Sequence, residues 1–166
     1  MTNELKLVKI DVHYCDYLRR YDNKVPYNEG TKELRPFIGV LFKVNSFLYF
    51  APLSSPRTKH LKLKDNIDFL RIDEGRLGAI NFNNMLPVHE KNIIEIHLNK
   101  EESSIDLKYQ KLLKKQLFWL NRNRNKLYRK SKYLYKSYVN KTLNDNVVKR
   151  CCDFLLLEKK SLEYNK

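Results

Sequence analysis

Two apolar runs separated by a two-residue turn signal constrain the fold of this chain more than any other feature. Residues 37–44 read Phe-Ile-Gly-Val-Leu-Phe-Lys-Val, and residues 47–53 read Phe-Leu-Tyr-Phe-Ala-Pro-Leu. Asn45-Ser46 between them is typical of a tight turn. Near-continuous apolar runs of this length, rich in aromatic and β-branched residues, favour buried strands. The sequence therefore predicts a β-hairpin at the centre of a sheet.

Further short apolar segments on both sides of the hairpin predict more strands. They lie at residues 7–10, 67–72, 79–82, 86–88 and 93–96. Asp11 can cap a helix that runs to Asp22, while residues 23–35 and 54–65 read as loops. Consecutive short strands of this kind indicate a compact, curved, antiparallel and barrel-like sheet.

The last third of the chain shows helical periodicity. Ser103 or Ser104 can cap a first helix that ends near Asn123, and two more patterns span residues 125–143 and 147–164. No repeat or linker divides the chain. We therefore expect one domain over residues 1–166, with an α+β fold in which an N-terminal helix and a C-terminal helical third accompany the sheet.

The charge of the chain is concentrated in this helical third. The whole chain has 33 Lys and Arg against 19 Asp and Glu, a net charge of +14. Residues 1–106 hold 16 basic against 15 acidic residues, whereas residues 107–166 hold 17 against 4. A genome of biased base composition would raise the Lys content evenly and does not account for this asymmetry. An acidic polymer is therefore the expected partner.

Residues 107–144 are unusual because they contain twelve Lys or Arg and no acid. Solvent-exposed helices usually mix charges, since like charges three or four residues apart weaken a helix. Aromatic residues are interleaved, and cations with flat rings are the usual means of binding single-stranded RNA. Phe118 and Tyr138 are expected to belong to the core instead. The candidate RNA-binding residues of this region are Lys115, Trp119, Lys126, Arg129, Lys130 and Lys132.

A dense group of hydroxyl and basic residues follows the hairpin directly. Ser54 and Ser55 come after Ala51-Pro52-Leu53, and Arg57, Lys59 and His60 follow within six residues. Hydroxyls beside cations can hold a phosphodiester and stabilise the charge that develops when it is cut. The alternative is an ordinary turn between two strands. From the residues alone the two interpretations stand equal.

Three segments together resemble a known family. They are residues 35–39 (Arg-Pro-Phe-Ile-Gly), 49–56 (Tyr-Phe-Ala-Pro-Leu-Ser-Ser-Pro) and 78–88 (Gly-Ala-Ile-Asn-Phe-Asn-Asn-Met-Leu-Pro-Val), and residues 22–26 and 114–117 agree with them. The chain is similar, from about residue 10 to 158, to the ToxN/AbiQ toxins of type III toxin–antitoxin and phage abortive-infection systems.

The resemblance implies an activity, a fold and a partner. It implies a metal-independent endoribonuclease with no cofactor, whose fold is like the Kid, MazF and CcdB toxins. It also implies target mRNAs and a repeated pseudoknot antitoxin RNA, which the toxin processes and with which it forms a closed protein–RNA assembly. Ser54 and Ser55 match the family's working hydroxyls, Arg57 stands where the family has Lys, and Arg35 is one residue from the usual basic position. Lys24 and Tyr49, within the similar segments, are further RNA-binding candidates.

The expected reaction is attack by the 2′-hydroxyl of RNA, which leaves a 2′,3′-cyclic phosphate and a 5′-hydroxyl. Arg57 can hold the phosphate through two parallel hydrogen bonds but cannot act as a base, because a guanidinium group keeps its proton in proteins. His60 is the first candidate for the base and Lys59 the second.

The remaining composition narrows the class of protein. The cysteines Cys15, Cys151 and Cys152 form no CxxC pattern, and the four histidines are scattered, so no metal site is expected. The N-terminus lacks the pattern of a signal peptide and no run is long enough to span a membrane, which indicates a cytoplasmic protein. The main alternative is a non-catalytic RNA-binding protein. A DNA-binding regulator and a metal-dependent nuclease are less well supported.

Overall fold

The computed structural model describes residues 3–27, 35–98 and 106–165, and it has the expected α+β architecture. The strands are β1 (Lys6–Ile10), β2 (Phe37–Gly39), β3 (Lys43–Val44), β4 (Phe47–Ser54), β5 (Phe69–Arg71), β6 (Ala79–Asn81), β7 (Leu86–Val88) and β8 (Ile93–Glu95). The helices are α1 (Val12–Arg19), α2 (Thr58–Lys62), α3 (Leu107–Arg122), α4 (Arg124–Val139), α5 (Asp145–Arg150) and α6 (Phe154–Tyr164). Short 3₁₀ turns lie at η2 (Asp73–Gly75), η3 (Phe82–Asn84) and η4 (Glu90–Asn92).

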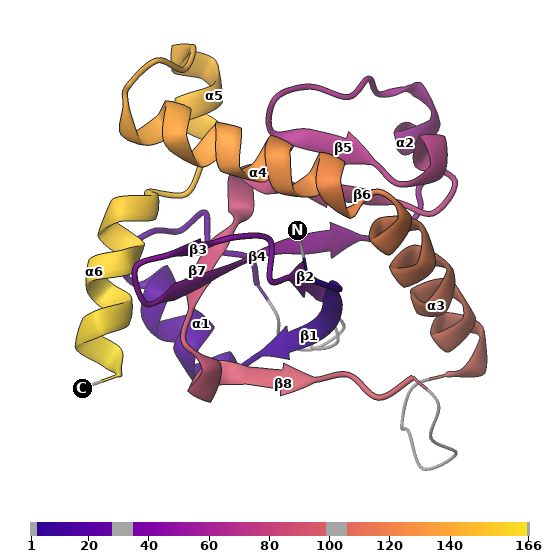
Figure 1. Ribbon diagram of the computed structural model, residues 1–166, viewed down its shortest axis with the longest axis horizontal. Coiled ribbons are helices and arrows are strands. Elements are labelled where there is room, and N and C mark those ends of the chain that lie inside the picture. Colours follow the sequence, from indigo (N-terminus) through magenta and orange to yellow (C-terminus); the bar gives the residue numbers. More distant parts are fainter. Residues whose placement is uncertain (1–2, 28–34, 99–105, 166) are drawn as a thin grey trace.

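The sheet is organised around β4, its longest strand. Every strand pairing is antiparallel, and the order is β5-β6-β4-β2-β1-β8, with β3 and β7 also paired to β4. Within the described residues the end strands β5 and β8 do not pair with each other, so the sheet is open. Figure 1 shows α6 and α1 at one side of the sheet, α3 at the other, and α4 crossing above it. The predicted class, a compact antiparallel sheet with an N-terminal helix and a C-terminal helical third, is confirmed.

The central hairpin is confirmed, although its first half is interrupted. Strands β2 and β3 are separated by residues 40–42, yet Leu41 and Phe42 still exchange backbone hydrogen bonds with Tyr49 at 2.9 and 3.0 Å. Gly39 lies against the ring of Phe50, where an added Cβ would come within 2.4 Å of a ring carbon. The close packing of the two strands therefore depends on a glycine at this position.

The N-terminal helix begins where its cap was expected. The carboxylate of Asp11 accepts a hydrogen bond from the backbone N–H of Tyr14 at 2.9 Å, and the helix α1 ends at Arg19 rather than at Asp22. The expected caps Ser103 and Ser104 of the first C-terminal helix lie outside the described residues. Asp106 fills this role for α3, since its carboxylate accepts from the N–H of Lys108 at 2.7 Å.

Two expectations for local structure were wrong. Residues 54–65 are not simply a loop, because Thr58–Lys62 forms α2. The last predicted helix, residues 147–164, is two helices, α5 and α6, with Cys151-Cys152-Asp153 between them. Asp153 accepts a hydrogen bond from the N–H of Leu156 at 3.1 Å and so starts a new helix where the pattern suggested a continuous one.

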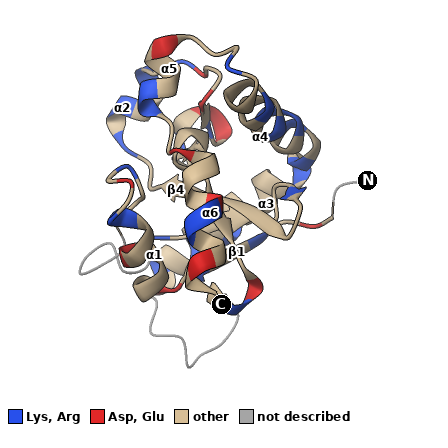
Figure 2. Ribbon diagram, turned by 90° about the vertical axis from the view of Figure 1, so that its left-hand side faces the viewer, with Lys and Arg blue, Asp and Glu red and all other residues tan. Residues whose placement is uncertain are grey.

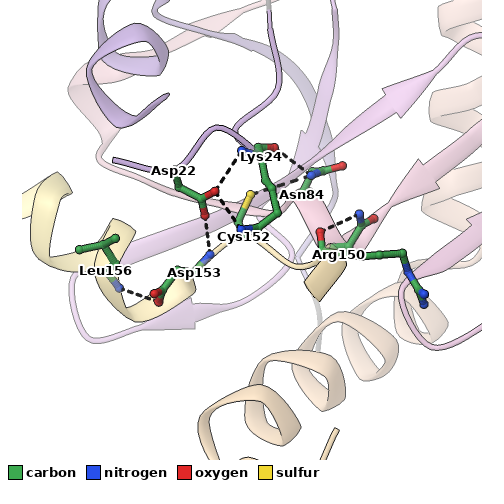
Figure 3. A network of polar contacts seen from close by, with 8 residues as sticks. Asp22, Lys24, Asn84, Arg150, Cys152, Asp153 and Leu156 are labelled. Carbon is green, nitrogen blue, oxygen red and sulfur yellow. Dashed lines mark hydrogen bonds and ion pairs between the residues drawn. The ribbon is translucent and has the colours of Figure 1, made fainter. Parts of the chain in front are cut away.

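A polar network ties three distant segments together beside this junction (Figure 3). The carboxylate of Asp22 accepts from the backbone N–H of Asp153 at 2.7 Å and lies 3.1 Å from the amine of Lys24. Asn84 donates to the backbone carbonyl of Lys24 at 2.9 Å, and the N–H of Cys152 donates to the carbonyl of Asn83 at 2.8 Å. The network joins the segment after α1, the turn η3 and the start of α6, and its buried polar groups are well satisfied.

Candidate active site

The two serines lie at the end of the central strand. Ser54 is the last residue of β4 and pairs with Ala79 of β6, and Ser55 follows it on the exposed surface. Gly78, just before β6, has a positive φ of 102°, and a Cβ there would lie 2.0 Å from the backbone oxygen of Ser54. The backbone of the serine pair is therefore held tightly from the β6 side.

The two hydroxyls have different partners. The side-chain amide of Asn81 donates to Oγ of Ser54 at 2.9 Å, so this hydroxyl is part of the sheet structure. Ser55 hydrogen-bonds with the hydroxyl of Tyr109 on α3. Burial raises the pKa of Tyr109, while this hydrogen bond and then the nearby charge of Arg35 act to lower it. Of the two serines, Ser55 is therefore the one that is exposed and that also interacts with helix α3.

Two arginines accompany the serines, and within the described residues neither has a carboxylate partner. Burial, and then the charge of Arg57, lower the pKa of Arg35, which shows that the two guanidinium groups lie near each other. Neither forms an ion pair with any residue in the described ranges. Two neighbouring cations without an anion favour the binding of one, such as a phosphate. Arg35, Ser55 and Arg57 therefore lie in one region of the structure, near Tyr109.

His60 occupies a structural position instead of an open one. Its side chain is only 2% exposed, and its Nδ1 accepts a hydrogen bond from the backbone N–H of Arg57 at 3.1 Å. This contact caps the first turn of α2. Burial, followed by the charges of Lys59 and Arg57, lowers the pKa of His60 below 6.5. The geometry does not support His60 as the base, whereas Lys59 beside it is exposed.

The RNA-binding candidates on the helices differ in exposure and in what their side chains contact. Lys115, Lys126 and Arg129 are exposed, although Nε of Arg129 also donates to the backbone carbonyl of Asn125 at 3.4 Å. Figure 2 shows basic residues along α4 with no acidic residue on that helix. Lys130 instead donates to the backbone carbonyl of Asn66, and Lys132 donates to the hydroxyl of Tyr128 at 2.7 Å. The amines of Lys130 and Lys132 therefore form hydrogen bonds within the fold.

Three aromatic or basic candidates are placed differently from what was expected. Tyr49 is fully buried and donates to the carboxylate of Glu158 at 2.5 Å, so its ring is closed to a base. Lys24 contributes its amine to the network around Asp22. Trp119 is half-buried against the core, whereas its neighbour Phe118, expected in the core, is 67% exposed with the guanidinium of Arg122 5.6 Å from its ring centre.

The sequence analysis missed two residues that contact the serines. Asn81 belongs to the similar segment 78–88, but nothing in its spacing connected it to Ser54. The sequence does not connect Tyr109 with Ser55, because a contact between α3 and the end of β4 spans more than fifty residues of sequence. Within the described residues no three His, Cys, Asp or Glu side chains converge as metal ligands, and no described helix is long and apolar enough to cross a membrane.

Comparison with known sequences identifies relatives along nearly the whole chain. Residues 6–161 match the family model described as toxin ToxN of type III toxin–antitoxin systems. The endoribonuclease ToxN of Bacillus thuringiensis subsp. kurstaki is 36% identical over 99% of this chain and 87% of its own. The endoribonuclease AbiQ of Lactococcus lactis subsp. lactis is 28% identical over 98% of this chain and 90% of its own.

Solved structures agree with this result. A toxin reported with selective inhibition by a non-coding RNA pseudoknot superimposes with a TM-score of 0.84, at 33% identity and 99% coverage of both chains. AbiQ, described as a lactococcal anti-phage endoribonuclease, gives a TM-score of 0.83 at 28% identity, covering 98% of this chain and 99% of its own. Fold and sequence therefore point to the same relatives.

Proposed function

The chain belongs to the ToxN family of type III toxin–antitoxin toxins, and from this membership and the site we propose that it cuts RNA with Ser55, Arg57 and Arg35. It is an endoribonuclease toxin of a type III system, with an RNA pseudoknot as its antitoxin. The observation that carries the assignment is the exposed Ser55 hydroxyl beside two guanidinium groups that have no carboxylate partner among the described residues.

The proposed reaction is transesterification without a metal ion. The 2′-hydroxyl of the substrate loses its proton to a base, and its oxygen attacks the adjacent phosphorus. The P–O5′ bond breaks and the leaving O5′ takes up a proton, so the products are a 2′,3′-cyclic phosphate and a 5′-hydroxyl. The protein's task is to align this attack and to stabilise the additional negative charge on the phosphorane oxygens.

Each residue of the site has a role in this scheme. Arg57 holds two phosphate oxygens through its planar group, and Arg35 supplies a second positive charge near it. Ser55 donates its hydroxyl hydrogen to a phosphate oxygen, while Ser54 holds the strand end through Asn81. Lys59, which is exposed beside Arg57, is the candidate base, and His60 positions the backbone of Arg57.

The RNA path extends from this site to the basic helices. Lys115, Lys126 and Arg129 contact phosphates, and Phe118 offers a ring on which an unpaired base can stack. The antitoxin pseudoknot occupies the same surface, which blocks target mRNA. The toxin cuts the antitoxin precursor at the same centre, and toxin and RNA alternate in a closed assembly that acts in the cytoplasm.

The test uses labelled RNA and the toxin freed from its antitoxin. The wild-type protein should cut the RNA, and the Ser55→Ala variant should bind it with unchanged affinity without cutting. Binding without cutting by the wild type would indicate a non-catalytic RNA-binding protein. Full cutting by Ser55→Ala would end the assignment of Ser55.

A further inference from the structure

Residues 77–81 form a short segment that packs against the backbone of both serines. Its Ala79 pairs with Ser54 in the sheet, and its Asn81 side chain holds the Ser54 hydroxyl at 2.9 Å. Gly78 approaches so closely that an added Cβ would lie 2.0 Å from the oxygen of Ser54 and 3.2 Å from the carbonyl carbon of Ser55. A small shift of this segment must therefore move the serines, because no space separates the two backbones.

One side chain ties this segment to the helical third. Nε2 of Gln116, on α3, donates a hydrogen bond of 2.7 Å to the backbone carbonyl of Leu77. Gln116 is 1% exposed, so water does not compete for this bond. Tyr109, two turns earlier on the same helix, contacts the Ser55 hydroxyl. The helix α3 therefore reaches the serine pair both directly and through residues 77–81.

The other end of the same amide is unsatisfied. Oε1 of Gln116 is the one buried side-chain nitrogen or oxygen that lacks a hydrogen-bond partner within the described parts of the chain. An unpaired buried acceptor destabilises a fold, and Leu or Met would fill a similar volume without this cost. A glutamine at position 116 is therefore less favourable for core packing than Leu or Met. We attribute its presence to the hydrogen bond that its Nε2 donates to Leu77.

We propose that Gln116 is a positioning residue for RNA cleavage, which holds residues 77–81 against the serine pair and so sets the position of the Ser55 hydroxyl. The inference rests on the proposed function of Ser55. It assigns to Gln116 no contact with RNA, so the residue acts on the rate of the chemical step and not on the binding of substrate. Misplacement of a reacting group by about 1 Å can cost about a hundredfold in rate.

The experiment replaces Gln116 with Met, which keeps the length and bulk of the side chain and removes the donor. We expect kcat to fall by about tenfold to a hundredfold with KM and RNA affinity unchanged. Thermal stability should stay close to wild type, because the lost hydrogen bond is offset by removal of the unpaired acceptor. Hydrogen exchange at the amides of residues 78–81 should become faster, a readout that does not depend on activity.

Gln110→Met is the matched control, since Gln110 is a second buried glutamine of α3. It should leave kcat unchanged. An equal loss in both variants, or wild-type kcat and exchange in Gln116→Met, would overturn the proposal.

A double-mutant cycle that combines Gln116→Met with Asn81→Ala should give strongly non-additive losses of kcat, because both residues act on the same serine. Additive losses would count against the proposal. Ser55→Ala measured in the same series reports the proposed function separately.

Discussion

Two polar clusters in this molecule differ in how their charges are satisfied. Around Asp22 the carboxylate has a lysine amine and backbone N–H groups as partners, and it is almost fully buried (Figure 3). Around Ser55 two guanidinium groups lie near each other with no carboxylate among the described residues. The charge of Asp22 is balanced within the fold, whereas the described residues supply no anion to the two arginines. We therefore expect RNA cleavage at the cluster around Ser55. The cluster around Asp22 contributes to the stability of the fold.

The largest expected effect comes from removing one of the two guanidinium groups near Ser55. Arg57→Ala should lower kcat/KM by about 10²–10³, the usual loss for one donor that stabilises developing charge. Arg57→Lys should retain much of the activity, since a cation remains. Arg76, an exposed arginine paired with Asp73 at 2.8 Å, provides the control. If Arg76→Ala lost as much activity as Arg57→Ala, the distinction between paired and unpaired arginines would fail.

Substitutions in the polar cluster around Asp22 should lower stability and leave catalytic activity unchanged. Asp22→Ala removes an acceptor of several hydrogen bonds, including charge-assisted ones, and should lower the free energy of unfolding by about 3 kcal/mol. Activity per folded molecule should stay near wild type. Asp16→Ala, which breaks a more exposed ion pair with Arg19, should cost less than about 1 kcal/mol. Denaturant titration measures both, and a loss of kcat without a loss of stability in Asp22→Ala would place this cluster in the catalytic machinery.

A smaller effect is expected at the outer surface of α3. Phe118→Ala should weaken binding of single-stranded RNA by about tenfold, within the range of about 1–3 kcal/mol for one stacked base. Leu107→Ala is the control, because Leu107 is 73% exposed on the same helix and has no ring. Titration at two salt concentrations separates stacking from phosphate contacts, since only the latter depend steeply on salt. Equal effects of the two substitutions would argue against stacking.

The smallest expected effect concerns pH. Burial is the main reason that the pKa of His60 lies below 6.5, so the folded protein favours the neutral ring that accepts from Arg57. This contribution to stability is complete above about pH 6.5 and is lost as the pH falls through the lowered pKa. His60→Asn offers an acceptor that does not titrate, and its stability should fall less between pH 7 and pH 5. Identical pH profiles for the two proteins would exclude this role of His60.

The sequence alone predicts those parts of the fold that local residue patterns determine. The hairpin, the cap at Asp11 and the order of strands before helices follow from apolar periodicity and turn residues, and the adjacency of Ser55 and Arg57 in the chain predicts them as site candidates. Contacts between distant segments could not be derived this way. Whether Phe118 or Trp119 faces solvent depends on how α3 packs, and the contact of Tyr109 with Ser55 depends on where that helix lies against the sheet. Burial of Tyr49 was missed because a tyrosine in a central strand and a tyrosine on a binding surface have the same local sequence.

The most direct test of the account is the chemical identity of the RNA ends formed in the presence of EDTA. The wild-type toxin and the Asp22→Ala variant should both produce 2′,3′-cyclic phosphate and 5′-hydroxyl ends, and Ser55→Ala should produce none. Products with 3′-hydroxyl and 5′-phosphate ends, or cleavage that stops when EDTA is added, would contradict a mechanism in which Ser55 and two arginines act on the phosphate without a metal ion.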